Sequence, residues 1–138
     1  MKSESAEVLH RWFEEVWNQG REEAIDEIFA EEGIAHGLVD ENGQELRGPA
    51  GFKPFFRRFK DAFPDMQIVI EDCICEGDQT AARCTVRARH TGEGLGVAAT
   101  NNAVEFTGMC IVRVEGGKIV EAWNNFDFMS LNQQIGVI

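Results

Sequence analysis

The sequence has no tyrosine, few basic residues and no long apolar run. Without tyrosine the chain offers no phenolic hydroxyl that could donate a proton or a hydrogen bond to a reacting oxygen. Thirteen Lys and Arg against 24 Asp and Glu give a formal net charge of −11, which argues against binding to nucleic acid or to an anionic membrane. No stretch approaches the roughly 18 apolar residues of a membrane-spanning helix.

Cysteines are few, and none has the spacing of a metal site. Cys73, Cys75, Cys84 and Cys110 include no CxxC pair and no Cys/His group with zinc spacing. The opening residues MKSESAEVLH are polar and contain no apolar signal core. We therefore expect a cytoplasmic protein with reduced, buried, structural cysteines and with neither a metal nor another cofactor.

The 138 residues predict a single domain, 1–138, with helices in its first half. Apolar residues at helical spacing predict helices over 4–18, 21–30 and 48–63. Five phenylalanines lie on one face of the third helix, which Pro49 begins and Pro64 ends. A core-facing helix explains these aromatic residues better than a cofactor site does.

The second half reads as strands over 66–76, 79–91, 103–115 and 118–126, followed by a short helix over 128–135. The segments EGDQ and EGGK mark tight turns between strands. The glycine-containing stretch 92–102 lacks the lysine of a phosphate-binding loop. The order predicts an α+β fold, in which the N-terminal helices pack on one face of a strongly curved antiparallel sheet and enclose an apolar pocket that is open at one end.

One carboxylate near the end of the chain attracts attention, because Asp127 lies between Phe126 and Phe128 in the segment EAWNNFDFMS. An ionised carboxylate among apolar groups is costly unless it is paired or hydrogen-bonded. Asp127 therefore either caps the last helix or is a functional acid in an apolar pocket. The two roles do not exclude one another.

Alternation along the strands places further polar residues without deciding which of them face inward. His90 ends the apolar row of the strand 79–91, where it is either a structural residue or a pocket residue. In the last strand Trp123, Asn125 and Asp127 share one face, and Asn124 and Phe126 share the other. The pattern leaves open which face lines the pocket.

Two segments, HTGEGLG at 90–96 and GGKIVEAWNNFDFMSLNQQIG at 116–136, resemble the SnoaL-like polyketide cyclases. The likeness extends over nearly the whole chain, through 16–37 and 48–72. The resemblance implies the cone-shaped fold of the nuclear-transport-factor-like superfamily. The chain departs from the family at 99–102, where it reads Ala-Thr-Asn-Asn and the family usually has a Pro-Thr-Gly run.

The resemblance also implies roles for individual residues. Asp127 matches the proton-transferring acid, and His90 and Trp123 match pocket residues, so Asp127 and His90 are the catalytic candidates. His36 matches a pocket position that is often polar. The expected substrate-binding residues are Trp123, Asn125, His36, Trp17, Phe56 and Phe59.

The function that follows is that of a cofactor-independent cyclase or isomerase-like enzyme, which would act by acid–base proton transfer of the intramolecular aldol type. Its substrate would be a polyketide or a similar apolar, carbonyl-rich small molecule. The lack of tyrosine excludes the chemistry of ketosteroid isomerases and scytalone dehydratases, which use tyrosine hydroxyls. The alternative is a non-catalytic binding or structural module with the same pocket. The resemblance further implies a homodimer that packs through the sheet.

Overall fold

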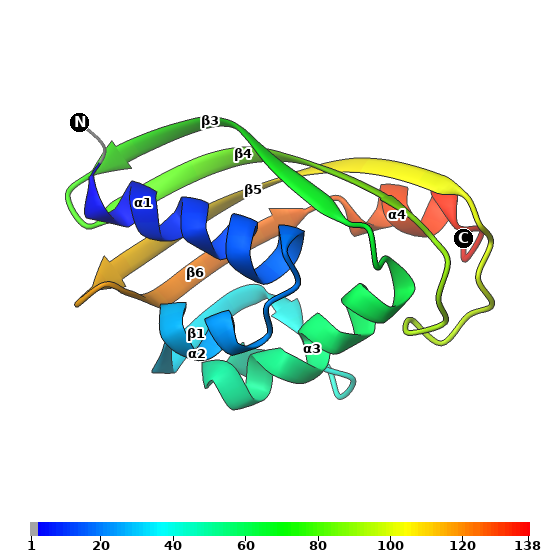
Figure 1. Cartoon of the computed structure of the whole chain (residues 1–138), viewed down its shortest axis with the longest axis horizontal. Coiled ribbons are helices and arrows are strands. Elements are labelled where there is room, and N and C mark those ends of the chain that lie inside the picture. The colour runs from blue at the N-terminus through cyan, green and yellow to red at the C-terminus, as the bar shows by residue number, and fades with distance from the viewer. Residues whose placement is uncertain (1–2) are drawn as a thin grey trace.

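A computed structural model describes residues 3–138 and shows a curved six-stranded sheet with helices packed on one face (Figure 1). The predicted α+β cone is therefore confirmed. No helix within the described residues is long and apolar enough to cross a membrane. The elements are α1 (Glu4–Arg11), the π-helix η1 (Trp12–Asn18), α2 (Glu23–Ile28), β1 (Phe29–Val39), β2 (Glu45–Arg47), α3 (Gly48–Ala62), β3 (Gln67–Glu76), β4 (Gln79–Arg89), β5 (Ala103–Glu115), β6 (Lys118–Phe126) and α4 (Phe128–Gln134).

The sheet has the order β2-β1-β6-β5-β4-β3. Strands β3 to β6 form the expected antiparallel meander, but β1 joins the edge of β6 in parallel. The sequence predicted only a brief apolar segment around 34–36, whereas β1 has 11 residues. Exposed Glu31 and Glu32 in the middle of β1 interrupt the alternation that would have revealed a longer strand.

The predicted first helix changes geometry at Trp12, where the α-helix becomes a π-helix. The N–H of Gln19 donates to the carbonyl of Glu14 at 2.9 Å, five residues earlier. In this wider helix Trp12, Phe13 and Trp17 are all buried. Two adjacent bulky side chains thus face the sheet together.

Helix α3 faces η1 through an aromatic layer. The ring centroid of Phe52 lies 4.9 Å from that of Trp12, and Phe56 lies 5.2 Å from Trp17. Lys60 joins the ends of the two helices, because its Nζ donates to the carbonyl of Trp17 at 3.0 Å and to that of Pro64 at 3.1 Å. These contacts hold α3 against η1.

A bulge in β6 decides which side chains face the helices. The pairing of β5 with β6 passes from Arg113↔Glu121 to Val114↔Ile119, so one residue of β6 is unmatched. As a result Ile119 and Ala122 both face inward. Asn124 and Phe126 follow on the inner face, and the intervening residues point outward.

The cysteines divide into two pairs, all with free thiols. Cys84 and Cys110 are buried as predicted, but Cys73 and Cys75 are exposed, so for this pair the prediction was wrong. Both exposed cysteines lie near the end of β3, an edge strand of the sheet. The Thr80 hydroxyl donates to Sγ of Cys75 at 3.2 Å.

Candidate functional site

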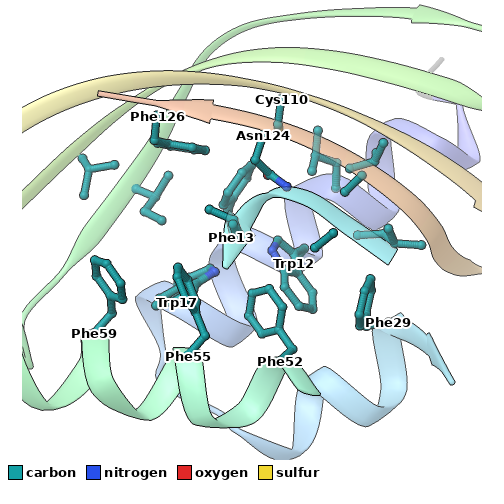
Figure 2. A pocket seen from close by; sticks show the side chains of 18 of the residues that line it. Trp12, Phe13, Trp17, Phe29, Phe52, Phe55, Phe59, Cys110, Asn124 and Phe126 are labelled. Carbon is teal, nitrogen blue, oxygen red and sulfur yellow. The ribbon is translucent and has the colours of Figure 1, made fainter. Parts of the chain in front are cut away.

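A cavity of about 70 Å³ lies between the helices and the inner face of the sheet. We call it the central cavity (Figure 2). The side chains that line it come from every layer of the fold. They are Leu9, Trp12, Phe13, Trp17, Phe29, Ala35, Leu38, Phe52, Phe55, Phe59, Met66, Ile68, Val86, Phe106, Cys110, Val112, Ile119, Ala122, Asn124, Phe126 and Phe128.

The wall nearest to solvent is aromatic. Phe59, Phe126 and Phe128 are half-buried, whereas the deeper rings are buried. Phe128 lies 5.7 Å from Phe59 and 6.3 Å from Phe126 between ring centroids. Gly108 makes room for this wall, because a Cβ added at Gly108 would lie 2.1 Å from Cδ2 of Phe126.

Few polar atoms reach the central cavity. Figure 2 shows the indole nitrogens of Trp12 and Trp17 and the amide nitrogen of Asn124 among the lining side chains. Nδ2 of Asn124 donates to the carbonyl of His36 at 3.0 Å. The thiol of Cys110 is the remaining polar group, and its hydrogen bond with Cys84 and its burial raise its pKa. No Asp, Glu, His, Lys or Arg among residues 3–138 lines the central cavity.

Asp127 does not lie in apolar surroundings. Its side chain is exposed and accepts the N–H of Ser130 at 3.0 Å, as the N-cap of α4. It lines an open groove on the outer side of the sheet, together with Arg83 and Met129. Phe126 and Phe128 line both this groove and the central cavity, whereas the exposed side chain of Asp127 lines the groove and not the cavity, so the desolvation expected for Asp127 is absent. Its catalytic role stays a prediction.

His90 is fully buried but does not line the central cavity, so its expected place in the wall was wrong. Its ring lies 5.4 Å from that of Phe63, beneath the loop 91–102. Nδ1 accepts the N–H of Thr100 at 3.2 Å, which places the ring proton on Nε2. Nε2 has no hydrogen-bond partner in the part of the chain that the structure describes. Its catalytic role also remains a prediction.

The loop 91–102 contains an unusual backbone conformation within the segment 99–102. The structure places Asn101 at φ 62°, in the left-handed region that favours glycine. Asparagine tolerates this region better than most residues do. The N–H of Asn101 donates to the carbonyl of His90 at 2.8 Å. Thr100 and Asn101 thus close the loop onto His90.

Three expected substrate-binding residues lie on the outer face of the sheet instead. Trp123 is 38% exposed, Asn125 is exposed, and His36 stacks on Trp123 with ring centroids 5.6 Å apart. His36 bridges two carboxylates, with Nδ1 2.6 Å from Glu45 and Nε2 2.7 Å from Glu121. These hydrogen bonds, that of Glu121 first, raise the pKa of His36. The bulge in β6 is the reason that this row faces away from the helices.

The expected substrate-binding residues on the helices are all buried or half-buried on the inner side, but only two of the three line the cavity. Trp17 and Phe59 line the central cavity, whereas Phe56 is buried in the same aromatic layer outside its lining. Whether they bind a substrate stays a prediction.

Two lining residues with polar atoms, Trp12 and Asn124, are not among the substrate-binding residues that the sequence predicted. The spacing of the apolar residues Ile119, Ala122 and Phe126 was the available signal. A straight strand does not place residues three apart on one face. A bulge between Ile119 and Ala122 would have put Asn124 on the inner face.

Residues 7–135 match the family model of the SnoaL-like polyketide cyclases. The chain is 27% identical over 130 residues to the aklanonic acid methyl ester cyclase DauD of Streptomyces sp. (strain C5), which covers 93% of this chain and 80% of DauD. The crystal structure of IdmH from Streptomyces antibioticus superposes with a TM-score of 0.82 at 28% identity, over 97% of this chain and 99% of IdmH. A SnoaL-like protein from Jannaschia sp. CCS1 has the same fold, with a TM-score of 0.84 at 19% identity over 100% of this chain and 98% of its own.

Proposed function

This chain belongs to the SnoaL-like polyketide cyclase family, and on that premise we propose that it is a polyketide cyclase that needs no cofactor. The proposed reaction is an intramolecular aldol closure of an apolar, carbonyl-rich molecule. A base removes a proton from a carbon between two carbonyls, the enolate carbon forms a bond to a second carbonyl carbon, and the resulting alkoxide takes up a proton. No atoms are lost, so the reaction is an isomerisation.

The observation that carries the proposal is the central cavity, in which aromatic walls surround a few groups that can hydrogen-bond to carbonyls. Removal from water strengthens each hydrogen bond to an oxygen on which charge develops. The substrate's own carbonyls spread the enolate charge, so a few donors suffice. The indole N–H groups of Trp12 and Trp17 are suitable donors.

Proton transfer is assigned to Asp127 and, with it, His90. Asp127 stands between Phe126 and Phe128, which both line the central cavity. We propose that its carboxylate turns from the N–H of Ser130 toward the substrate when the cavity is filled. The buried Nε2–H of His90 would donate to a substrate oxygen if the loop 91–102 shifts.

The central cavity must widen to hold such a substrate. Its volume is about 70 Å³, whereas sites for drug-sized ligands measure roughly 300–1,000 Å³. The half-buried rings Phe59, Phe126 and Phe128 form the wall that separates the cavity from solvent. We propose that these three rings part when the substrate enters.

A turnover assay with aklanonic acid methyl ester tests this function, with product separation by liquid chromatography. The wild-type chain should accelerate ring closure, and Asp127→Asn should abolish the acceleration. Asparagine is also a good N-cap, so this variant should keep its fold. Asp78→Asn is the matched control, because Asp78 is an exposed carboxylate between β3 and β4 that lines neither the cavity nor the groove of Asp127. An Asp127→Asn variant that turns over substrate at the wild-type rate would remove Asp127 from the mechanism.

A binding module without catalysis is the second candidate, and one observation favours it. No carboxylate or imidazole within residues 3–138 lines the central cavity, and Asp127 already has a structural role as a helix cap. A module of this kind would bind the ester tightly and leave it unchanged. Calorimetric binding without turnover would decide for it.

We also propose that two copies pack through the outer face of the sheet, in the cytoplasm. Met109, Ile111 and Trp123 are exposed apolar side chains on this face, and they line one groove. The mass in solution by light scattering should be that of a dimer. Ile111→Glu should give monomers, whereas Val137→Glu, at an exposed position near the end of the chain, should not.

A further inference from the structure

The central cavity carries no charge. Its lining within residues 3–138 contains no acidic, basic or histidine side chain, and its thiol, Cys110, has a raised pKa from its hydrogen bond with Cys84 and from burial. A carboxylate that entered would be a buried anion without a counter-charge, which costs several kcal/mol. The walls therefore favour an uncharged ligand.

The orientation of the Asn124 amide is fixed. Nδ2 donates to the carbonyl of His36 at 3.0 Å, at the point where β1 leaves β6. Gly37 follows at φ 85°, and a Cβ added there would lie 1.9 Å from the carbonyl oxygen of Asn124. The backbones of Gly37 and Asn124 are thus in close contact beside this hydrogen bond. This bond uses one of the two Nδ2 hydrogens, and Oδ1 accepts no hydrogen bond from residues 3–138, so Oδ1 is available as an acceptor for a ligand.

The indoles of Trp12 and Trp17 supply hydrogen-bond donors, whereas Oδ1 of Asn124 is an acceptor. An indole N–H donates and cannot accept. Trp12 and Trp17 extend from η1 into the lining, opposite β6, which carries Asn124 (Figure 2). No side-chain hydrogen bond of these indoles to another protein group is present within residues 3–138. The cavity therefore presents donors from the helix and an acceptor from the sheet.

The guanidinium of Arg58 lies behind an aromatic residue of the cavity lining. The guanidinium of Arg58 is 5.7 Å from the ring centroid of Phe55, a lining residue. Arg58 itself does not line the cavity; its Nη2 is 3.5 Å from the carbonyl of Val39, and its Nε is 3.9 Å from Glu41. Its charge is thus directed toward the end of β1 and is separated from the cavity by an aromatic ring.

We propose that the central cavity selects an uncharged ligand that offers a carbonyl oxygen to the indoles of Trp12 and Trp17 and a hydroxyl or enol proton to Oδ1 of Asn124. This selection rests on the proposed function, since it describes the substrate of the same cavity.

Four probes of one shape test the selection: ethylbenzene, acetophenone, 1-phenylethanol and benzoate. The tryptophans report on it directly, because Trp12 and Trp17 line the cavity and Trp123 lies on the outer face. In ¹H–¹⁵N spectra acetophenone should shift the indole N–H signals of Trp12 and Trp17 and leave that of Trp123 in place. Both acetophenone and 1-phenylethanol should bind at least about tenfold more tightly than benzoate.

Variants separate the donors from the acceptor. Trp17→Phe should reduce the advantage of acetophenone over ethylbenzene, and Trp123→Phe is the matched control outside the cavity. Asn124→Leu should remove the advantage of 1-phenylethanol over ethylbenzene and leave that of acetophenone. If Asn124→Leu does not fold, the four probes on the wild-type chain still decide.

Three results would overturn the selection: benzoate binding as tightly as acetophenone, benzoate affinity that depends on Arg58 in an Arg58→Gln variant, or no probe that shifts the Trp12 and Trp17 signals. Failure of the proposed cyclase activity looks different. In that case the probes discriminate as described, but aklanonic acid methyl ester is not converted.

Discussion

The two faces of the sheet differ in charge and in the polar groups that they carry. Within residues 3–138, the inner face and the helices enclose aromatic rings, one amide and no charged side chain. The outer face bears Trp123 and the cluster of His36, Glu45, Glu121 and Arg113, in which carboxylates contact both ring nitrogens of the imidazole. Asn124 and Trp123 are neighbours in β6 and belong to opposite environments.

This difference shows that, within residues 3–138, the carboxylate, imidazole and basic side chains are separated from the enclosed volume. A ligand in the central cavity meets hydrogen-bond donors and acceptors, whereas Asp127 lies in an outer groove at the end of β6. Catalysis by Asp127 therefore requires a movement that brings the two together. Binding alone requires only that the cavity widens, by the parting of Phe59, Phe126 and Phe128 proposed above.

The largest expected effect comes from opening the aromatic layer of the inner face. Phe52 is 2% exposed and contacts Trp12 and Phe29 with centroid distances of 4.9 and 5.8 Å. Phe52→Ala should lower the free energy of unfolding by about 3–5 kcal/mol, because the lost contacts leave a void. Urea denaturation measures the change. Ile74→Ala, at a 75% exposed position of the outer face, should change it by less than about 0.5 kcal/mol, and equal losses would contradict the comparison.

A smaller effect follows from crowding the inner face. In Gly108→Ala the new methyl group would meet Phe126, whose Cδ2 is 2.1 Å from the added Cβ. The expected loss in the free energy of unfolding is about 1–3 kcal/mol. In a Phe126→Ala background the same change should cost much less, as a double-mutant cycle in urea would show. An unchanged cost in that background would mean that Phe126 is not the cause.

Next comes the outer carboxylate that caps α4. Asp127→Ala should lower the free energy of unfolding by about 1 kcal/mol, since the N–H of Ser130 loses its acceptor. Asp127→Asn should be close to neutral, because the amide oxygen caps equally well. Thermal melts of the two variants measure the difference. Identical losses in both would show that the charge, and not the cap, matters for stability.

The smallest effect concerns pH and the outer cluster. Hydrogen bonds to Glu121 and Glu45 raise the pKa of His36 above 6.5 in the folded state. This contribution to stability is therefore complete below about pH 6.5 and is lost as pH rises through the raised pKa. The contribution of Glu121 to stability depends on pH in the opposite direction. His36 lowers the pKa of Glu121 below 4.5, and this contribution is lost as pH falls through the lowered pKa.

The corresponding measurement is a set of thermal melts from pH 6 to 9 on the wild-type chain and on His36→Gln. The melting temperature of the wild-type chain should fall on the alkaline side more than that of the variant. His10→Gln is the control, because His10 contacts the carbonyl of Ala6 and no carboxylate. Parallel curves for wild type and His36→Gln would remove His36 as the origin of the pH dependence.

The sequence predicted most of the elements because their signals are local. The bounds of β5 and β6 were predicted as the structure has them, since tight turns and alternation mark both strands. The parallel pairing of β1 with β6 was missed, because a pairing between segments far apart leaves no local pattern. The π-helix was missed for a related reason: Trp12 and Phe13 fit one apolar stripe of an α-helix equally well.

The amino-acid sequence by itself determined most helices and strands, the aromatic face of α3 and the negative net charge, because each depends on composition or on short-range periodicity. The family and its cone-shaped fold came from the resemblance of segments along nearly the whole chain. Only the tertiary structure decided which face of β6 meets the helices. A single unmatched residue in β6 exchanges the faces before and after it. That exchange placed Asn124 inside and Trp123, Asn125 and Asp127 outside. The register of the hydrogen bonds with β5 decides the face of each side chain, and the sequence pattern alone does not reveal where that register shifts.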